Sequence, residues 1–149
     1  MEIVSDRRYR FPVARDEVWR AMASVGDYRR WWPWLRALEA EALAAGDVWT
    51  CVVQPPLPYR LTFEVRLVDV VAPSDITAEV TGDVVGRARL AVRELPAGTE
   101  IRLQSWLGPG SRALQAVAAV ARPLVRRGHD WVFDTGAHQF RDRALHTPG

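Results

Sequence analysis

Lysine is absent from this sequence. All 20 basic residues are arginines, so the positive charge persists to very high pH. The arginines never run longer than pairs such as Arg7 and Arg8, and the 18 acidic residues interspersed among them leave a formal net charge of +2. A nucleic-acid-binding protein is expected to gather its positive charge on one face or arm. We therefore expect no nucleic-acid partner.

Cysteine and long apolar runs are equally scarce. The single cysteine, Cys51, excludes an intrachain disulfide. The first eight residues contain no apolar core of a signal peptide, so we expect none. The most apolar stretch, residues 113–125, is too short to span a bilayer and is interrupted by Arg122 and Pro123. We expect no integral membrane segment and a cytoplasmic protein.

The strand pattern dominates what is present. The 149 residues, 48% hydrophobic and 26% charged, fit one domain over residues 1–149. Alternating apolar and charged residues predict several strands. These are residues 2–11, 35–43, 48–54, 60–67, 76–81, 87–93 and 100–105. Residues 35–43 are the weakest, because their alanine and glutamate content also suits a helix. The turns between these segments favour an antiparallel meander with one face in water.

Helical spacing is found in two regions. After the first strand, apolar residues recur at helical spacing from Ala14 until Gly26, and a second short helix is expected from Asp27 until Pro33. The pattern is helical again over residues 111–145, a length of roughly 50 Å.

A proline interrupts this long C-terminal helix. We expect Pro123 to kink it near Ala119, because proline removes one hydrogen bond and clashes with that carbonyl. The fold class is therefore α+β. We expect a curved antiparallel sheet of about seven strands wrapped around a long C-terminal helix, with two short helices after the first strand.

The two apolar walls predict a ligand site. The apolar face of the sheet must pack against the C-terminal helix, whose face carries small residues such as Ala121. A twisted sheet cannot touch such a helix along its whole length, which favours an apolar gap. The alternative is that large side chains fill the gap. Candidate ligand-binding residues are Trp49, Phe63, Val65, Leu90 and Leu103 on the sheet, and Val117, Ala121, Trp131, Val132, Thr135 and Gln139 on the helix.

No set of residues converges on catalysis or metal binding. His129 and His138 fall on opposite sides of the helix, and two ligands from one helix make an incomplete site. We therefore expect no metal and no cofactor. Cys51 is expected to pack as a small buried hydrophobe. Asp69 is the one strand carboxylate with inward parity, unless a bulge near Val70 turns it outward.

Three of the seven tryptophans surround one proline. Trp31, Trp32 and Trp34 lie beside Pro33, and all three cannot face one core from so short a helix. They cover one end of the sheet, rim the mouth of the cavity, or form the contact of a homodimer. The residues leave these alternatives open.

Several motifs resemble one superfamily. The runs at 11–19, FPVARDEVW, and 27–33, DYRRWWP, look like the opening of the START-related, Bet v 1-like superfamily. They are closest to its bacterial polyketide cyclase/dehydratase and lipid-transport group, also called SRPBCC. Matching features follow at 45–49, 82–86 and 128–131. The resemblance covers essentially the whole chain. It implies a helix-grip fold whose cavity holds an apolar ligand such as a lipid, sterol, isoprenoid or polyketide.

Three functional hypotheses follow. The leading one is a non-catalytic binding or carrier protein for a small apolar molecule, because two apolar walls meet without a convergent polar group. The second is a polyketide cyclase/dehydratase-like enzyme, which needs an acid or base aimed inward, such as Asp69. The third is a protein-interaction or regulatory module that uses the tryptophan segment or the charged face of the sheet.

Overall fold

A seven-stranded antiparallel sheet forms the frame of the molecule. The computed structural model describes residues 2–145. The strands are β1 (Ile3–Phe11), β2 (Leu35–Glu39), β3 (Val48–Val53), β4 (Leu61–Val71), β5 (Asp75–Gly82), β6 (Val84–Leu95) and β7 (Gly98–Pro109). They lie in the order β1-β7-β6-β5-β4-β3-β2. The predicted meander is confirmed from β2 to β7, and β1 closes the far edge by pairing with β7. The weakest predicted strand is shorter than expected and ends at Glu39.

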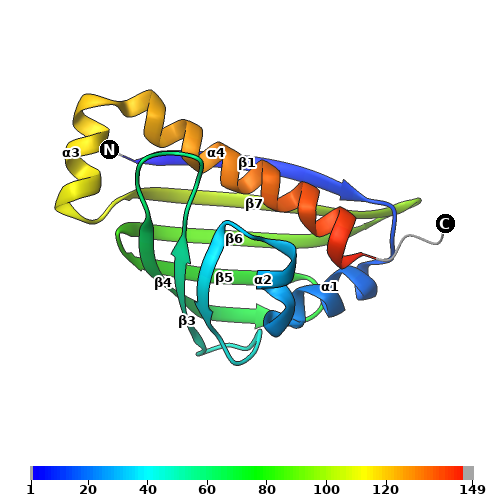
Figure 1. Cartoon of the computed structure of the whole chain (residues 1–149). Helices are drawn as coiled ribbons and strands as arrows, with labels where there is room; N and C mark the ends of the chain where they lie inside the picture. Colours follow the sequence, from blue (N-terminus) through cyan, green and yellow to red (C-terminus); the bar gives the residue numbers. More distant parts are fainter. Residues whose placement is uncertain (1, 146–149) are drawn as a thin grey trace.

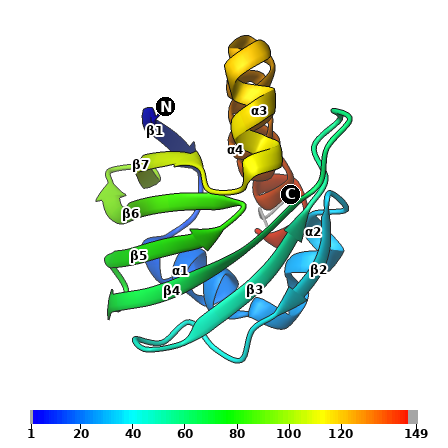
Figure 2. The same ribbon diagram turned by 90° about the vertical axis from the view of Figure 1, so that its left-hand side faces the viewer.

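Short helices cover one end of this sheet, and the longest helix crosses its concave side. Helix α1 (Arg15–Ala23), a 3₁₀ turn (Val25–Asp27) and α2 (Tyr28–Trp31) follow β1. After β7 come α3 (Arg112–Val120), α4 (Arg122–Gln139) and a π-helical turn (Phe140–Ala144). Helix α4 crosses the sheet obliquely and ends near α1 and α2 (Figure 1). Figure 2 shows the sheet curling, with β1 and β2 on opposite sides of the C-terminal helices. The predicted α+β helix-grip architecture is confirmed.

The C-terminal helix is broken, which corrects the prediction of one helix kinked near Ala119. Ala121 leaves helical geometry, with φ −136° and ψ 59°, and separates α3 from α4. Pro123 then lies in the first turn of α4, where its missing N–H needs no acceptor and its ring meets no preceding turn. Breaking the helix therefore costs less than bending it around proline. As a result α3 points away from the axis of α4 (Figure 1).

Two cores pack at the two ends of α4. The larger one joins the sheet to α1, α2 and the π-helical turn, where the ring of Phe140 meets Phe11 at 5.5 Å and Trp31 at 5.6 Å. The smaller core lies under α3 and the start of α4, around Leu114 and Val125. The middle of α4 is therefore held over the sheet from both ends.

The outer face of the sheet is charged, as the alternation predicts. Arg66 pairs with Glu79 at 2.5 Å, directly across the β4–β5 ladder, and Arg93 pairs with Asp75 at 2.9 Å. Such exposed pairs add little stability, but opposite charges across neighbouring strands favour this register. Over residues 2–145, no helix combines the length and apolarity needed to cross a bilayer.

Candidate functional site

A cavity of about 380 Å³ lies between the concave face of the sheet and α4. Its wall is almost entirely apolar. Residues from all seven strands, α1, α2, α4 and the π-helical turn line it, together with the segments on either side of β2. Two small residues of α4 line the cavity, Gly136 and Ala137, in place of the predicted Ala121. Gly136 lets Trp34 approach so closely that a Cβ there would lie 3.2 Å from its ring. The gap between the walls is therefore hollow rather than filled by large side chains.

The predicted binding residues separate into two groups. Six of them line the cavity: Trp49, Phe63, Val65, Leu90, Leu103 and Val132. All five sheet residues are among these, because period-two alternation fixes which strand positions face inward. The remaining five, all on the predicted helix, do not line it.

The helix break explains the position of those five. Val117 packs in the smaller core, and Ala121 forms the break itself. Trp131 and Gln139 both contact Trp34. The rings of Trp131 and Trp34 meet edge to face with their centroids 6.4 Å apart, and the side-chain oxygen of Gln139 accepts a hydrogen bond from the Trp34 indole at 2.8 Å.

Thr135 is the last of the five. It is partly buried and lies outside the wall. The cavity face of α4 consists of Val132, Phe133, Gly136 and Ala137, and Phe140 of the following π-helical turn extends it. The prediction treated residues 111–145 as one continuous helix. The helical face chosen in that way is rotated away from the face of α4 that lines the cavity.

Many further residues line the wall, and Tyr9, Trp32, Trp34 and Phe133 are among those outside the predicted binding set. Tyr9 lines the cavity from β1, and its parity with Phe11 could have indicated this. Trp32 and Trp34 stack on each other at 5.5 Å and close one end of the cavity. Phe133 completes the wall on α4. The tryptophan positions depend on how α2 docks beneath α4, which no local pattern records.

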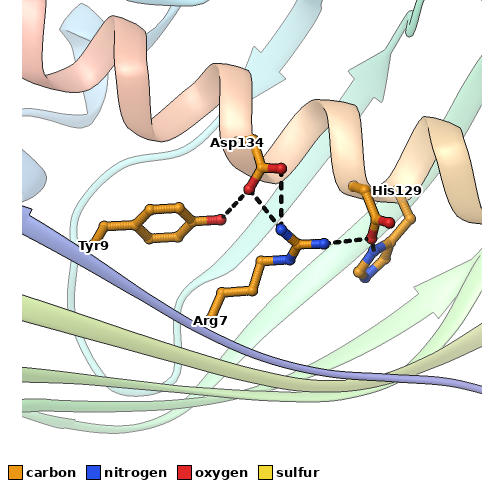
Figure 3. A network of polar contacts seen from close by, with 5 residues as sticks. Arg7, Tyr9, His129 and Asp134 are labelled. Atoms are coloured by element: carbon orange, nitrogen blue, oxygen red, sulfur yellow. Dashed lines mark hydrogen bonds and ion pairs between the residues drawn. The ribbon is translucent and has the colours of Figure 1, made fainter.

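A polar network adjoins the cavity and ties β1 to α4 (Figure 3). The guanidinium of Arg7 donates to both carboxylate oxygens of Asp134, at 2.8 and 3.0 Å, and contacts Asp130 at 2.9 Å. The hydroxyl of Tyr9 donates to the same Asp134 at 2.9 Å. Of these four residues, only Tyr9 also lines the cavity. Asp134 is thus held by two donors on the neighbouring strand.

Known proteins resemble this chain in structure rather than in sequence. No family model matches it, and no curated protein matches it. The Zhui aromatase/cyclase from Streptomyces sp. R1128 superposes with a TM-score of 0.73 at 14% identity, over 100% of this chain and 99% of that one. Ara h 8.0201 superposes with a TM-score of 0.57 at 11% identity, over 90% of this chain and 99% of that one. The chain has the helix-grip fold that these structures share.

A third helix-grip structure is longer than this chain. The di-domain ARO/CYC BexL from the BE-7585A biosynthetic pathway has a TM-score of 0.78 at 15% identity. The match covers 99% of this chain and 51% of BexL, so the chain spans about half the length of that protein. At such identities the likeness establishes the fold.

The carboxylates and histidines within residues 2–145 of this helix-grip protein lie outside the cavity wall. A bulge between Leu67 and Asp69 shifts the register of β4, which exposes Asp69 and turns Val70 towards the core. Of the two orientations considered for Asp69, the structure shows the outward one, which a bulge produces. His129 lies against Phe133 at 4.3 Å and contacts Asp130 at 3.1 Å. Burial lowers the pKa of His129.

Within residues 2–145, no group of three or more His, Cys, Asp or Glu side chains is placed to hold a metal ion. His138, the second histidine of the helix, is exposed, and its i−4 neighbour Asp134 pairs with Arg7 and Tyr9 instead.

Cys51 is a buried cavity residue, as its shared strand face with Trp49 and Val53 predicts. Burial raises the pKa of the Cys51 thiol from 9.0 to about 12. At pH 8 it therefore carries about a thousandfold less thiolate than an ordinary thiol. We expect iodoacetamide to alkylate the folded protein at least a thousandfold more slowly than the urea-unfolded chain, as followed by intact mass.

The pH dependence separates the raised pKa from simple shielding. Because only the thiolate reacts, the alkylation rate of the folded protein should keep rising about tenfold per pH unit between pH 8 and 10. The unfolded chain should level off above its ordinary pKa. A plateau near pH 9 in the folded protein would show that the Cys51 pKa is not raised.

Proposed function

We propose that this chain binds a small apolar molecule in the helix-grip cavity and shields it from water without transforming it. The observation that carries the proposal is the hollow of about 380 Å³ with an almost entirely apolar wall. Such a space buries most of a small ligand's surface, and burial of apolar area is the main source of its affinity.

The cavity wall lacks a group suited to acid–base catalysis, which supports binding over catalysis. Within residues 2–145, no carboxylate or histidine lines the cavity. Tyr9 is a poor general acid or base, because burial and its hydrogen bond to Asp134 both raise its pKa. The Cys51 thiol is kept protonated by its own burial. A general acid or base needs a pKa near the working pH, and neither residue provides one.

A polyketide cyclase-like enzyme is the second candidate. The fold it shares with the Zhui aromatase/cyclase and the ARO/CYC BexL favours it. A cavity that holds a flexible chain in a reactive conformation can accelerate cyclisation by proximity alone. This reading still requires a proton donor or acceptor at the bound chain. The interaction module finds less support, because Trp31 is only 7% exposed and Trp32 and Trp34 belong to the cavity wall.

Titration with N-phenyl-1-naphthylamine tests the proposal. This neutral aromatic probe fluoresces strongly only in apolar surroundings. We expect a blue-shifted, saturable signal with one site per chain and a Kd on the order of 10 µM. Urea-unfolded protein is the control and should give no saturable signal. A folded protein that gives none would contradict the proposed function.

A further inference from the structure

The corner between α3 and α4 (residues 112–127) carries positive charge. It lies within residues 101–129, the longest stretch of the sequence without aspartate or glutamate, which contains five arginines. Arg112, Arg126 and Arg127 are exposed, and among the residues that the structure describes no carboxylate pairs with any of them. Several arginines on the outer face of the sheet, by contrast, pair with acidic residues of neighbouring strands. The corner therefore presents a basic surface.

The outer face of α3 adds an apolar row to this surface. A spacing of four residues places Arg112, Ala116 and Val120 on one side of the helix, and all three are exposed. Val120 is 90% exposed, more than any other large hydrophobic residue in the described part of the chain. Leu114 and Ala118, on the opposite side of α3, fill the smaller core. The outward row therefore makes no contribution to that core.

The helix break makes the corner prominent. Helix α3 turns away from the axis of α4 and stands at the end of the sheet opposite to α1 and α2 (Figures 1 and 2). The β3–β4 loop supports the start of α4 at the same end, where Gly128 lets Leu57 and Tyr59 approach closely. A flat surface that approaches this end of the molecule therefore meets the corner before the sheet.

We propose that the α3–α4 corner docks reversibly on an anionic lipid surface. The arginines contact lipid phosphates, which the guanidinium group matches in charge and geometry, and Val120 enters the boundary between headgroups and acyl chains. Basic and apolar residues on one exposed helix are the combination that binds in the plane of an anionic membrane without crossing it. Docking needs no ligand in the cavity, so the proposal goes beyond the proposed function.

An acidic protein would match the charge of the corner but not its apolar part. The centre of a protein interface is a cluster of large apolar side chains that are buried together. Val120 is surrounded on the outer face of α3 by small or polar residues, namely Arg112, Gln115, Ala116 and Ala119. Acyl chains, in contrast, close around a single apolar side chain. The observations therefore favour a lipid surface over an acidic protein.

Cosedimentation with vesicles tests the docking. Phosphatidylcholine vesicles that contain about 30% phosphatidylglycerol are compared with pure phosphatidylcholine vesicles in about 50 mM NaCl. We expect half of the protein to bind at about 1 mM of the anionic lipid mixture. At least about tenfold more lipid should be needed with pure phosphatidylcholine, or with the anionic vesicles in about 500 mM NaCl, because salt screens the arginines.

Two charges of the corner are removed in the double variant Arg112→Gln, Arg127→Gln. Each arginine near an anionic surface contributes about fivefold in affinity, so this variant should need about 25-fold more lipid. The double variant Arg20→Gln, Arg29→Gln is the matched control. It has the same net charge but loses exposed arginines of α1 and α2, at the other end of the molecule, and should bind like the unaltered protein.

Val120→Gln tests the apolar contact. Because Val120 is 90% exposed, the substitution leaves the core intact, and it should raise the lipid requirement at least about fivefold. Val71→Gln is the matched control, since Val71 is 57% exposed at the end of β4, and it should leave vesicle binding unchanged.

Three outcomes would overturn the docking. The folded protein stays in the supernatant with anionic vesicles, or the arginine variant of the corner binds them as well as its control does. In the third, binding falls in the arginine variant but not in Val120→Gln, which means that the corner recognises charge alone, as contact with an acidic protein requires. The assay contains no cavity ligand, so each of these outcomes leaves the proposed apolar binding standing.

Discussion

Replacing Ala88 with phenylalanine lowers the affinity for N-phenyl-1-naphthylamine at least tenfold. Ala88 lines the cavity from β6, where it lies opposite Ala78 on β5 and Ser105 on β7. Its side chain points into empty space, so a benzyl group enters the hollow and occupies the volume that a ligand needs. Overpacking is costly when it displaces neighbours, whereas here it fills a void. We therefore expect binding to be lost and the unfolding temperature to stay within a few degrees.

Val120→Phe is the matched control for this substitution. Val120 ends α3 beyond the cavity and is 90% exposed, so the same aromatic group there should leave probe affinity unchanged. Binding is measured by fluorescence titration and folding by thermal unfolding. An Ala88→Phe protein that is folded and binds the probe with undiminished affinity would place the ligand site outside this cavity.

Gly86→Ala destabilises the protein by more than about 3 kcal/mol. Gly86 lies in β6 with φ +146°, and a Cβ at this position would lie 1.8 Å from the carbonyl oxygen of Trp106 on β7. Backbone atoms of a central ladder cannot move aside as the end of a flexible side chain can. The strain therefore spreads along the β6–β7 pairing. Urea unfolding followed by circular dichroism measures the loss.

Gly46→Ala separates steric contact from backbone preference. Gly46 also has a positive φ, +92°, but a Cβ there would have no neighbour within 4 Å. This substitution should cost about 1–2 kcal/mol through the left-handed conformation alone. Equal losses in the two variants would show that the close approach of Trp106 is not what requires glycine at position 86.

The sheet could be predicted because its information is local. Alternation over residues 60–67 sets Phe63 and Val65 inward without knowledge of any other strand, and the structure places both in the cavity wall. The bulge between Leu67 and Asp69 shows the limit of that reasoning. A bulge depends on the partner strand, so alternation alone could not decide whether the Asp69 side chain faces inward or outward.

The helical wall could be predicted only in part, because its face depends on where the helix begins again. Pro123 signals an interruption in the sequence, yet a kink and a break leave the same local pattern. Once Ala121 ends α3, α4 is free to rotate as a separate unit. Its inward residues then include Phe133 and Gly136 in place of Thr135. The network around Arg7 was missed for a related reason, since its partners lie on α4, more than a hundred residues away in the chain.

The pairing of β1 with β7 also constrains the order in which the sheet can form. Ile3 lies opposite Leu107, and Phe11 lies opposite Thr99, so β1 can join the sheet only after β7, which follows it by about ninety residues, has been made. Helix α4 follows β7 in the chain and closes the hollow later still. Contacts between such distant segments slow folding. The cavity is therefore enclosed only after β7 and α4 have both been added to the chain.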